Sequence, residues 1–215
     1  MVEHVYRRAE QARGVDAVLV ATDDERIAKA VADFGGFAVM TSATHATGTD
    51  RLAEVASALE GDIVVNVQGD EPLIAPEAIA EAIGPLLDRP DELIGTLRRR
   101  IDDPADLANP SVVKVVVDME GYALYFSRAP IPFVRPGLTP PVAWRHVGLY
   151  AYRRSVLLAL AALPQTQLER AEGLEQLRAL EHGRRIRTVE TTSDPIGVDT
   201  PEDLERVRQL VGNGD

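Results

Sequence analysis

The sequence predicts an α/β protein with a mostly parallel sheet. Short apolar segments alternate with amphipathic helical segments from the N-terminus onward, a pattern typical of βαβ units. The apolar segments are rich in β-branched residues, as in residues 63–67 (Ile-Val-Val-Asn-Val), which is typical of strands buried on both faces. Because parallel strands need a crossover connection, usually a helix, the alternation favours a right-handed parallel arrangement.

The first half of the chain shows this alternation most clearly. Its strands are expected at residues 17–21, 37–40, 63–67 and 93–97. Its helices are expected at residues 2–12, 25–34, 52–59 and 77–87. Capping residues support three of these helices: Gly14 follows the first, Thr22-Asp23-Asp24 precedes the second, and Pro76 opens the fourth.

The second half changes character after a helical turn at residues 102–107. Residues 112–117 and 122–127 are predicted to form two strands joined by a four-residue turn. A proline-spaced loop at 130–141 follows. The remaining expected elements are a strand at 145–152, helices at 155–163 and 169–182, a strand at 185–190 and a helix at 200–211.

Composition limits the function classes. The 215 residues carry 23 basic and 34 acidic side chains, a net charge of −11, so the surface as a whole repels nucleic acid and anionic membranes. No apolar run approaches the roughly 20 residues of a membrane helix, and the N-terminus lacks the pattern of a secretory signal. The absence of cysteine excludes disulfides and fits a cytoplasmic protein.

Two carboxylates are the strongest candidates for chemistry. Asp70 lies just past the predicted strand at 63–67, and Asp199 again lies between a strand and a helix. Carboxylates from two such loops can share one Mg²⁺ ion, which commonly takes one or two carboxylates together with phosphate oxygens. A simpler interpretation also holds, in which Asp199 belongs to a helix cap made by Thr200, Pro201 and Asp203.

Polar residues elsewhere have weaker signals. Arg145 could bind a carboxylate or phosphate, and His146 could hydrogen-bond hydroxyl groups, although isolated residues of this kind are more often a surface ion pair and a half-buried histidine. Glu172, Glu175 and Gln176 are expected on one helix, with 172 and 176 sharing a face. The sequence contains no Walker loop, no Gly-x-Gly-x-x-Gly and no Gly-x-Ser-x-Gly. From the residues alone, the expectation ends at an α/β protein with a Mg²⁺–phosphate site.

Several segments resemble the 3-deoxy-manno-octulosonate (KDO) cytidylyltransferases, which make CMP-KDO for lipopolysaccharide. The resemblance is collinear over nearly the whole chain. It is carried by Val20-Ala21-Thr22-Asp23, His45, Thr47 to Glu54, Asn66 to Pro72, Asn109-Pro110, Val112 to Val116, Gly121 to Arg128, Arg145 to Tyr150, Leu174 to Arg178 and Gly197 to Leu204.

The resemblance implies a three-layer sheet of the nucleotide-diphospho-sugar transferase type, Rossmann-like, with a small β-rich lobe around residues 110–145. It also implies a CTP-dependent nucleotidyltransferase that uses Mg²⁺ and forms a homodimer, with CTP and KDO as small-molecule substrates. Asp70 and Asp199 would hold the metal. The sugar acid would meet Gln68, Arg145, His146, Glu175 and Gln176, with Arg145 at its carboxylate and Glu172 as a weaker candidate. Gly48, Thr49 and Arg51 would lie near the cytidine.

The chain departs from the family pattern at its N-terminus. Family members begin with a further strand and a loop rich in Arg, Ser, Pro and Lys that binds the triphosphate, whereas Met1 here already matches the following helix. We therefore expect residues 1–215 to be one domain, N-terminally truncated relative to the family through a misplaced start, a fragment or genuine loss. Two alternatives to CMP-KDO synthesis follow: an inactive sugar-acid or nucleotide binder, and a cytidylyltransferase for 8-amino-KDO or sialic acid.

Overall fold

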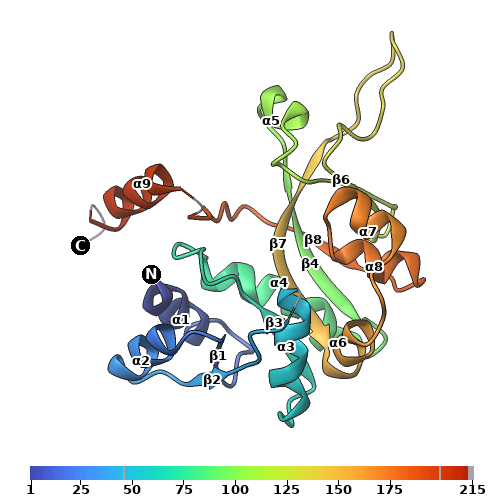
Figure 1. Ribbon diagram of the computed structural model, residues 1–215. Coiled ribbons are helices and arrows are strands. Elements are labelled where there is room, and N and C mark those ends of the chain that lie inside the picture. Colours follow the sequence, from blue (N-terminus) through green and yellow to red (C-terminus); the bar gives the residue numbers. More distant parts are fainter. Residues whose placement is uncertain (46, 199, 213–215) are drawn as a thin grey trace.

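The computed structural model describes residues 1–45, 47–198 and 200–212. The strands are β1 (Val20–Thr22), β2 (Ala38–Met40), β3 (Ile63–Asn66), β4 (Ile94–Arg100), β5 (Lys114–Val117), β6 (Ala123–Ser127), β7 (Trp144–Arg153) and β8 (Arg187–Glu190). The helices are α1 (Val2–Glu10), α2 (Glu25–Asp33), α3 (Gly48–Ser57), α4 (Pro76–Asp88), α5 (Pro104–Ala108), α6 (Arg154–Ala161), α7 (Gln167–Glu172), α8 (Gln176–Glu181) and α9 (Pro201–Gly212). Their arrangement is shown in Figure 1.

The α/β class is confirmed, but the sheet is mixed and the expectation of a mostly parallel sheet is wrong. The larger sheet has the order β6-β5-β7-β4-β8, and β3 also pairs with β7. The long strand β7 runs antiparallel to β3, β4 and β5, while β4 and β8 are parallel. Hydrophobic patterning could not reveal this, because a strand buried on both faces has the same composition whichever way its neighbours run.

A second, smaller sheet stands apart from the first. It consists of β1 and β2, which pair in parallel, with Ala21 opposite Val39. Helix α2 packs against both strands. Figure 1 shows this unit beside α1, next to the larger sheet.

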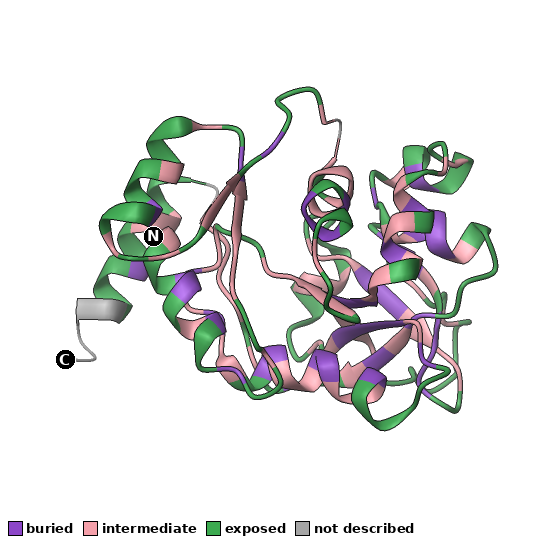
Figure 2. Cartoon of the chain, turned by 90° about the horizontal axis from the view of Figure 1, so that it is seen from below, coloured by how far each residue is buried: buried purple, intermediate pink, exposed green. Residues whose placement is uncertain are grey.

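Helices cover both faces of the larger sheet, as the three-layer architecture requires. One core lies between the sheet and helices α3, α6 and α8, and contains Phe126, Leu157 and Leu177. The other lies between the sheet and helices α1 and α4, and contains Ile79 and Ile83. Figure 2 shows buried positions concentrated where these elements meet.

Helix ends follow the sequence signals in several places. Asp24 caps α2 by accepting from the Arg26 amide, and Pro76 is the first residue of α4. The capping box at the last helix is present, since Thr200 and Asp203 exchange backbone and side-chain hydrogen bonds.

The single helix expected at residues 169–182 is wrong. Gly173 adopts a left-handed conformation with φ of +63° and separates α7 from α8. A helix cannot continue through such a residue, and glycine reaches this conformation without steric cost. Glu172 and Gln176 therefore lie on different helices and do not share a helix face.

Residues 112–127 form a hairpin, as expected, with β5 and β6 antiparallel. Both strands belong to the larger sheet through the pairing of β5 with β7. The proline-spaced loop after β6 projects away from the rest of the chain in Figure 1. Among the described residues, no helix has the length and apolar character needed to span a membrane.

Candidate active site

The loop after β3 carries Asp70 and is joined to a distant part of the chain. The Asp70 carbonyl accepts a hydrogen bond from the Val198 amide at 2.9 Å. Gln68 is exposed at the beginning of the same loop, and its carbonyl accepts from the Glu71 amide. The tertiary structure thus places the segment that ends at Val198 directly beside Asp70.

Glu71 gives this loop unusual electrostatics. Burial, and next the neighbouring Asp70 carboxylate, raise the pKa of Glu71 to about 7. Its Oε2 atom is buried without a hydrogen-bond partner in the described part of the chain. A carboxylate oxygen in this position lacks a compensating charge or donor, and a hard cation such as Mg²⁺ would supply one. The donor chemistry of the loop therefore fits a divalent cation.

Asp199, the second predicted metal ligand and catalytic carboxylate, lies outside the described residues. Within the parts of the chain that are described, no group of three or more His, Asp or Glu side chains is placed to hold a metal ion. What the structure provides is the position of Val198, the residue before Asp199, against Asp70.

The beginning of α3 contains the three residues predicted near the nucleotide. Gly48 is its first residue, and Thr47 caps it by accepting from the Asp50 amide. Arg51 forms an ion pair with Asp23 at 3.1 Å, just past the end of β1. Arg51 is therefore held across the end of the smaller sheet.

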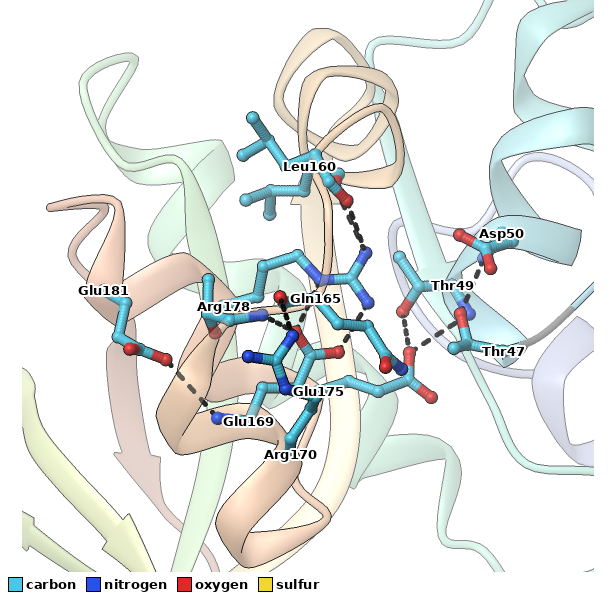
Figure 3. Close-up of polar contacts among 12 residues, drawn as sticks. Thr47, Thr49, Asp50, Leu160, Gln165, Glu169, Arg170, Glu175, Arg178 and Glu181 are labelled. Carbon is cyan, nitrogen blue, oxygen red and sulfur yellow. Dashed lines mark hydrogen bonds and ion pairs between the residues drawn. The ribbon is translucent and has the colours of Figure 1, made fainter.

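Thr49 connects α3 to the residues predicted for the sugar. Its hydroxyl donates to the Glu175 carboxylate at 2.5 Å, and its amide lies 3.4 Å from the same carboxylate oxygen. Figure 3 shows this contact bridging the two helix starts. Thr49, Glu175 and Gln176 also line one small cavity, of about 20 Å³, together with Tyr150, Tyr152 and other residues. A cavity of that size holds about one water molecule, so a sugar would need side chains to move before entering.

A buried ion pair supports the floor of this cavity. Arg178 and Glu169 are 4% and 3% exposed, and the guanidinium donates to both carboxylate oxygens, at 2.8 and 2.5 Å. Arg178 also donates to the carbonyls of Leu160 and Leu163. These contacts, drawn in Figure 3, tie α7 and α8 to the end of α6. They fix the start of α8, where Glu175 and Gln176 lie.

His146 faces the core that borders the cavity. Its ring packs against the rings of Phe126 and Tyr150, with centroids 5.0 and 5.2 Å apart. Burial lowers its pKa to about 3, so the ring is neutral at physiological pH. The Thr96 hydroxyl donates to the Leu149 carbonyl at 2.8 Å, which leaves it to accept from His146 Nε2 at 3.0 Å. His146 Nδ1 is then the acceptor of the ring.

Arg145 and His146 lie on opposite faces of β7. Neighbouring residues of a strand point to opposite faces of the sheet, and Arg145 lies on the face away from Phe126 and Tyr150. Its guanidinium contacts the Asp194 carboxylate. The predicted contact of Arg145 with a sugar carboxylate stays a prediction.

The Glu172 carboxylate is hydrogen-bonded to other parts of the protein. Its carboxylate accepts from the Ser127 hydroxyl at 2.6 Å and from the Arg128 amide at 2.9 Å. Burial opposes ionisation, but these hydrogen bonds outweigh it and lower the pKa of Glu172. Glu172 therefore ties α7 to the end of β6, which accounts for its position without a ligand.

Sequence reasoning missed Tyr150 and Tyr152 as cavity residues. Burial raises the pKa of both phenols, and the Tyr150 hydroxyl is buried with no hydrogen-bond partner among the described residues. Their alternation along one strand was the available signal, because residues 146, 150 and 152 are separated by even numbers of residues and so share a face of β7.

Comparison with known proteins identifies the family of this chain. The cytidylyltransferase family model matches residues 1–186. The chain is 57% identical to the 3-deoxy-manno-octulosonate cytidylyltransferase of Geobacter sulfurreducens, over 96% of this chain and 87% of that protein. It is 55% identical to the enzyme of the same name from Solibacter usitatus, over 98% of this chain and 83% of that protein.

Solved structures extend the comparison. A CMP:2-keto-3-deoxy-manno-octonic acid synthetase in complex with CTP superimposes with a TM-score of 0.94 at 48% identity, covering 99% of this chain and 87% of that one. The fold alone is shared with the 4-diphosphocytidyl-2C-methyl-D-erythritol synthase of Anaerococcus prevotii, with a TM-score of 0.64 at 15% identity, over 98% of this chain and 88% of that one. The chain belongs to the cytidylyltransferase family and, within it, to the 3-deoxy-manno-octulosonate cytidylyltransferases.

Proposed function

We propose that this chain transfers the cytidylyl group of CTP to KDO, giving CMP-KDO and pyrophosphate. In this reaction the anomeric hydroxyl of KDO forms a bond to the α-phosphorus of CTP, and the bond to pyrophosphate breaks. The observation that carries the proposal is the hydrogen bond between Val198 and Asp70, which joins the two predicted metal-binding loops. The relatives named above, more than half identical over nearly the whole chain, support the same reaction.

Asp70 and Asp199 would hold a Mg²⁺ ion, which when bound neutralises charge on the triphosphate. The start of α3, with Gly48, Thr49 and Arg51, would lie toward the cytidine. Amide groups at a helix start and a guanidinium are hydrogen-bond donors, so together they suit the acceptor atoms of a nucleotide.

The sugar side would involve Gln68, His146, Glu175 and Gln176. The neutral His146 ring can accept a hydrogen bond from a sugar hydroxyl at Nδ1, because Nε2 is already committed to Thr96. Glu175 can accept a further hydrogen bond from a sugar hydroxyl while Thr49 orients its carboxylate, which would link the two substrate positions. The cytoplasmic location, the homodimer and the smaller lobe at residues 110–145 stay predictions.

The direct test measures pyrophosphate release with CTP, Mg²⁺ and KDO, on this chain and on a version extended upstream by the family's strand and phosphate loop. We expect KDO-dependent release that ceases on chelation of the metal and falls more than about a hundredfold in Asp70→Asn. A panel containing KDO, 8-amino-KDO and sialic acid identifies the sugar. Absence of release from the extended chain with every sugar would contradict the proposal, and binding of KDO without turnover would favour a non-catalytic binder.

A further inference from the structure

Two arginines on the face of the sheet opposite His146 converge on one carboxylate. Arg99 of β4 and Arg145 of β7 are directly opposite each other in the antiparallel pairing of the two strands. Arg145 donates a hydrogen bond to Asp194, and Arg99 Nη1 lies 2.7 Å from Asp194 Oδ2. The two arginine side chains are 28% and 22% exposed.

Placing Arg99 and Arg145 opposite each other lowers the stability of the sheet, and a carboxylate shared between them offsets this loss. Like charges directly opposite across two strands destabilise the sheet. Burial, and after it the charge of Arg99, lower the pKa of Arg145, because both disfavour the charged guanidinium. Asp106 acts on Arg145 in the opposite direction, but Asp194 is the carboxylate in contact with both arginines.

Asp194 lies in the middle of a segment that has no helix or strand of its own. Residues 191–198 lead from the end of β8 toward α9, as Figure 1 shows. The segment is tied at its start by the Thr191 amide, which donates to the Arg98 carbonyl at 2.9 Å. It is tied at its end by the Val198 amide, which donates to Asp70. Asp194 provides the side-chain contact between these two ends.

We propose that Asp194, held by Arg99 and Arg145, is a positioning residue that sets where Val198, the residue before the proposed metal ligand Asp199, meets Asp70. This rests on the proposed function, because it presumes that Asp70 and Asp199 share the metal. Without regular secondary structure, the segment depends on such contacts to oppose its conformational freedom. Loss of the central contact leaves a longer free stretch before Val198, and the hydrogen bond to Asp70 opens more often.

The test compares the unsubstituted chain with Asp194→Asn, Asp194→Glu and a control, Asp102→Asn. Asp102 also pairs with an arginine, Arg100, but both side chains are well exposed, at 74% and 64%. Two quantities are measured on each: hydrogen exchange of the Val198 amide, and the affinity for Mn²⁺ alone, followed by electron paramagnetic resonance.

We expect Asp194→Asn to speed exchange at Val198 and to weaken Mn²⁺ binding by about tenfold, the lower range for residues that support metal ligands. The Thr191 amide should keep its protection from hydrogen exchange, because its hydrogen bond to the Arg98 carbonyl precedes Asp194 in the chain. Asp194→Glu should recover part of both effects, and Asp102→Asn should match the unsubstituted chain.

Unchanged exchange at Val198, or unchanged Mn²⁺ affinity, in Asp194→Asn would overturn the inference. A lower KM for KDO in Asp194→Asn with normal Mn²⁺ binding would also overturn it, because Asp194 would then compete with the sugar carboxylate for Arg145. Failure of the unsubstituted, upstream-extended chain to bind Mn²⁺ would contradict the proposed metal site itself. Normal Mn²⁺ binding by that chain, with no effect of Asp194→Asn, would contradict only the positioning role of Asp194.

Discussion

Thr49 and Glu175 join the two substrate sides of the site. The Thr49 hydroxyl at the start of α3 donates to the carboxylate of Glu175 at the start of α8, 2.5 Å away. The two residues are 126 positions apart in the sequence. Their contact means that a residue predicted near the cytidine and a residue predicted for the sugar acid are joined by a direct hydrogen bond.

Replacing Thr49 with valine tests this connection. Valine keeps the shape of threonine and removes the donor, so Glu175 loses the hydrogen bond that orients it. A hydrogen bond to a charged group contributes about 1.5–3 kcal/mol, and we expect KM for KDO to rise about tenfold or more. Steady-state kinetics with each substrate varied in turn measures the effect. Thr49→Ser, which keeps the hydroxyl, is the control, and equal KM values in the two variants would contradict the assignment.

The buried pair of Glu169 and Arg178 is expected to be critical for stability. Arg178→Met leaves a buried carboxylate without its partner, a change that typically costs about 3–5 kcal/mol. Lys29→Met, which breaks an exposed pair within α2, should cost no more than about 0.5 kcal/mol. Urea unfolding at neutral pH measures both free energies. Equal losses of unfolding free energy in the two variants would show that the buried pair contributes no more to stability than the exposed pair.

The same pair predicts a pH dependence. Burial alone would raise the pKa of Glu169, but hydrogen bonds from Arg178 and Thr166 lower it below the unfolded value. The pair therefore stabilises the fold at neutral pH, and this stabilisation is lost as the pH falls through the lowered pKa. In Arg178→Met burial is opposed only by the hydrogen bonds from Thr166, so the pKa of Glu169 rises and that variant should become more stable, relative to the unsubstituted chain, as the medium is acidified. Unfolding free energies measured from pH 7 downward give the two slopes.

Gly95 allows α4 to pack closely on β4. A Cβ atom at this position would lie 2.3 Å from the Ala82 carbonyl oxygen, which belongs to the helix backbone and cannot move aside alone. Gly95→Ala should therefore destabilise the protein by about 1–3 kcal/mol. Gly84→Ala, in the same helix with open space around it, should instead stabilise by about 0.5–1 kcal/mol. Thermal unfolding distinguishes them, and a shift of the same sign in both would contradict the packing argument.

His146 should make the fold sensitive to mild acid. Its pKa of about 3 in the folded state lies below the unfolded value of about 6.5. Between these values the unfolded chain binds a proton that the folded chain does not, so stability falls as the pH drops from about 6.5 toward 3. His146→Gln removes this proton and should flatten the dependence between pH 6.5 and 4.5. Parallel curves for the two proteins would show that His146 is protonated in the folded state.

The sequence by itself determined the α/β class, most element positions and the family. Local signals were sufficient for these, because a cap such as Asp24, a helix-opening residue such as Pro76 and a β-branched run such as β3 act within a few residues. The family motifs then gave every candidate site residue a role. None of these inferences required knowing which segments are neighbours in space.

Only the tertiary structure decided the direction of β7 and the break at Gly173. The direction of a buried strand is set by its connections and not by its composition, and a backbone reversal at one glycine leaves the flanking helical pattern intact. Asp194 had no signal at all, because its partners Arg99 and Arg145 come from strands distant in the sequence. Pairings of this kind depend on register and on which face a residue occupies, and both are fixed only when the whole sheet has assembled.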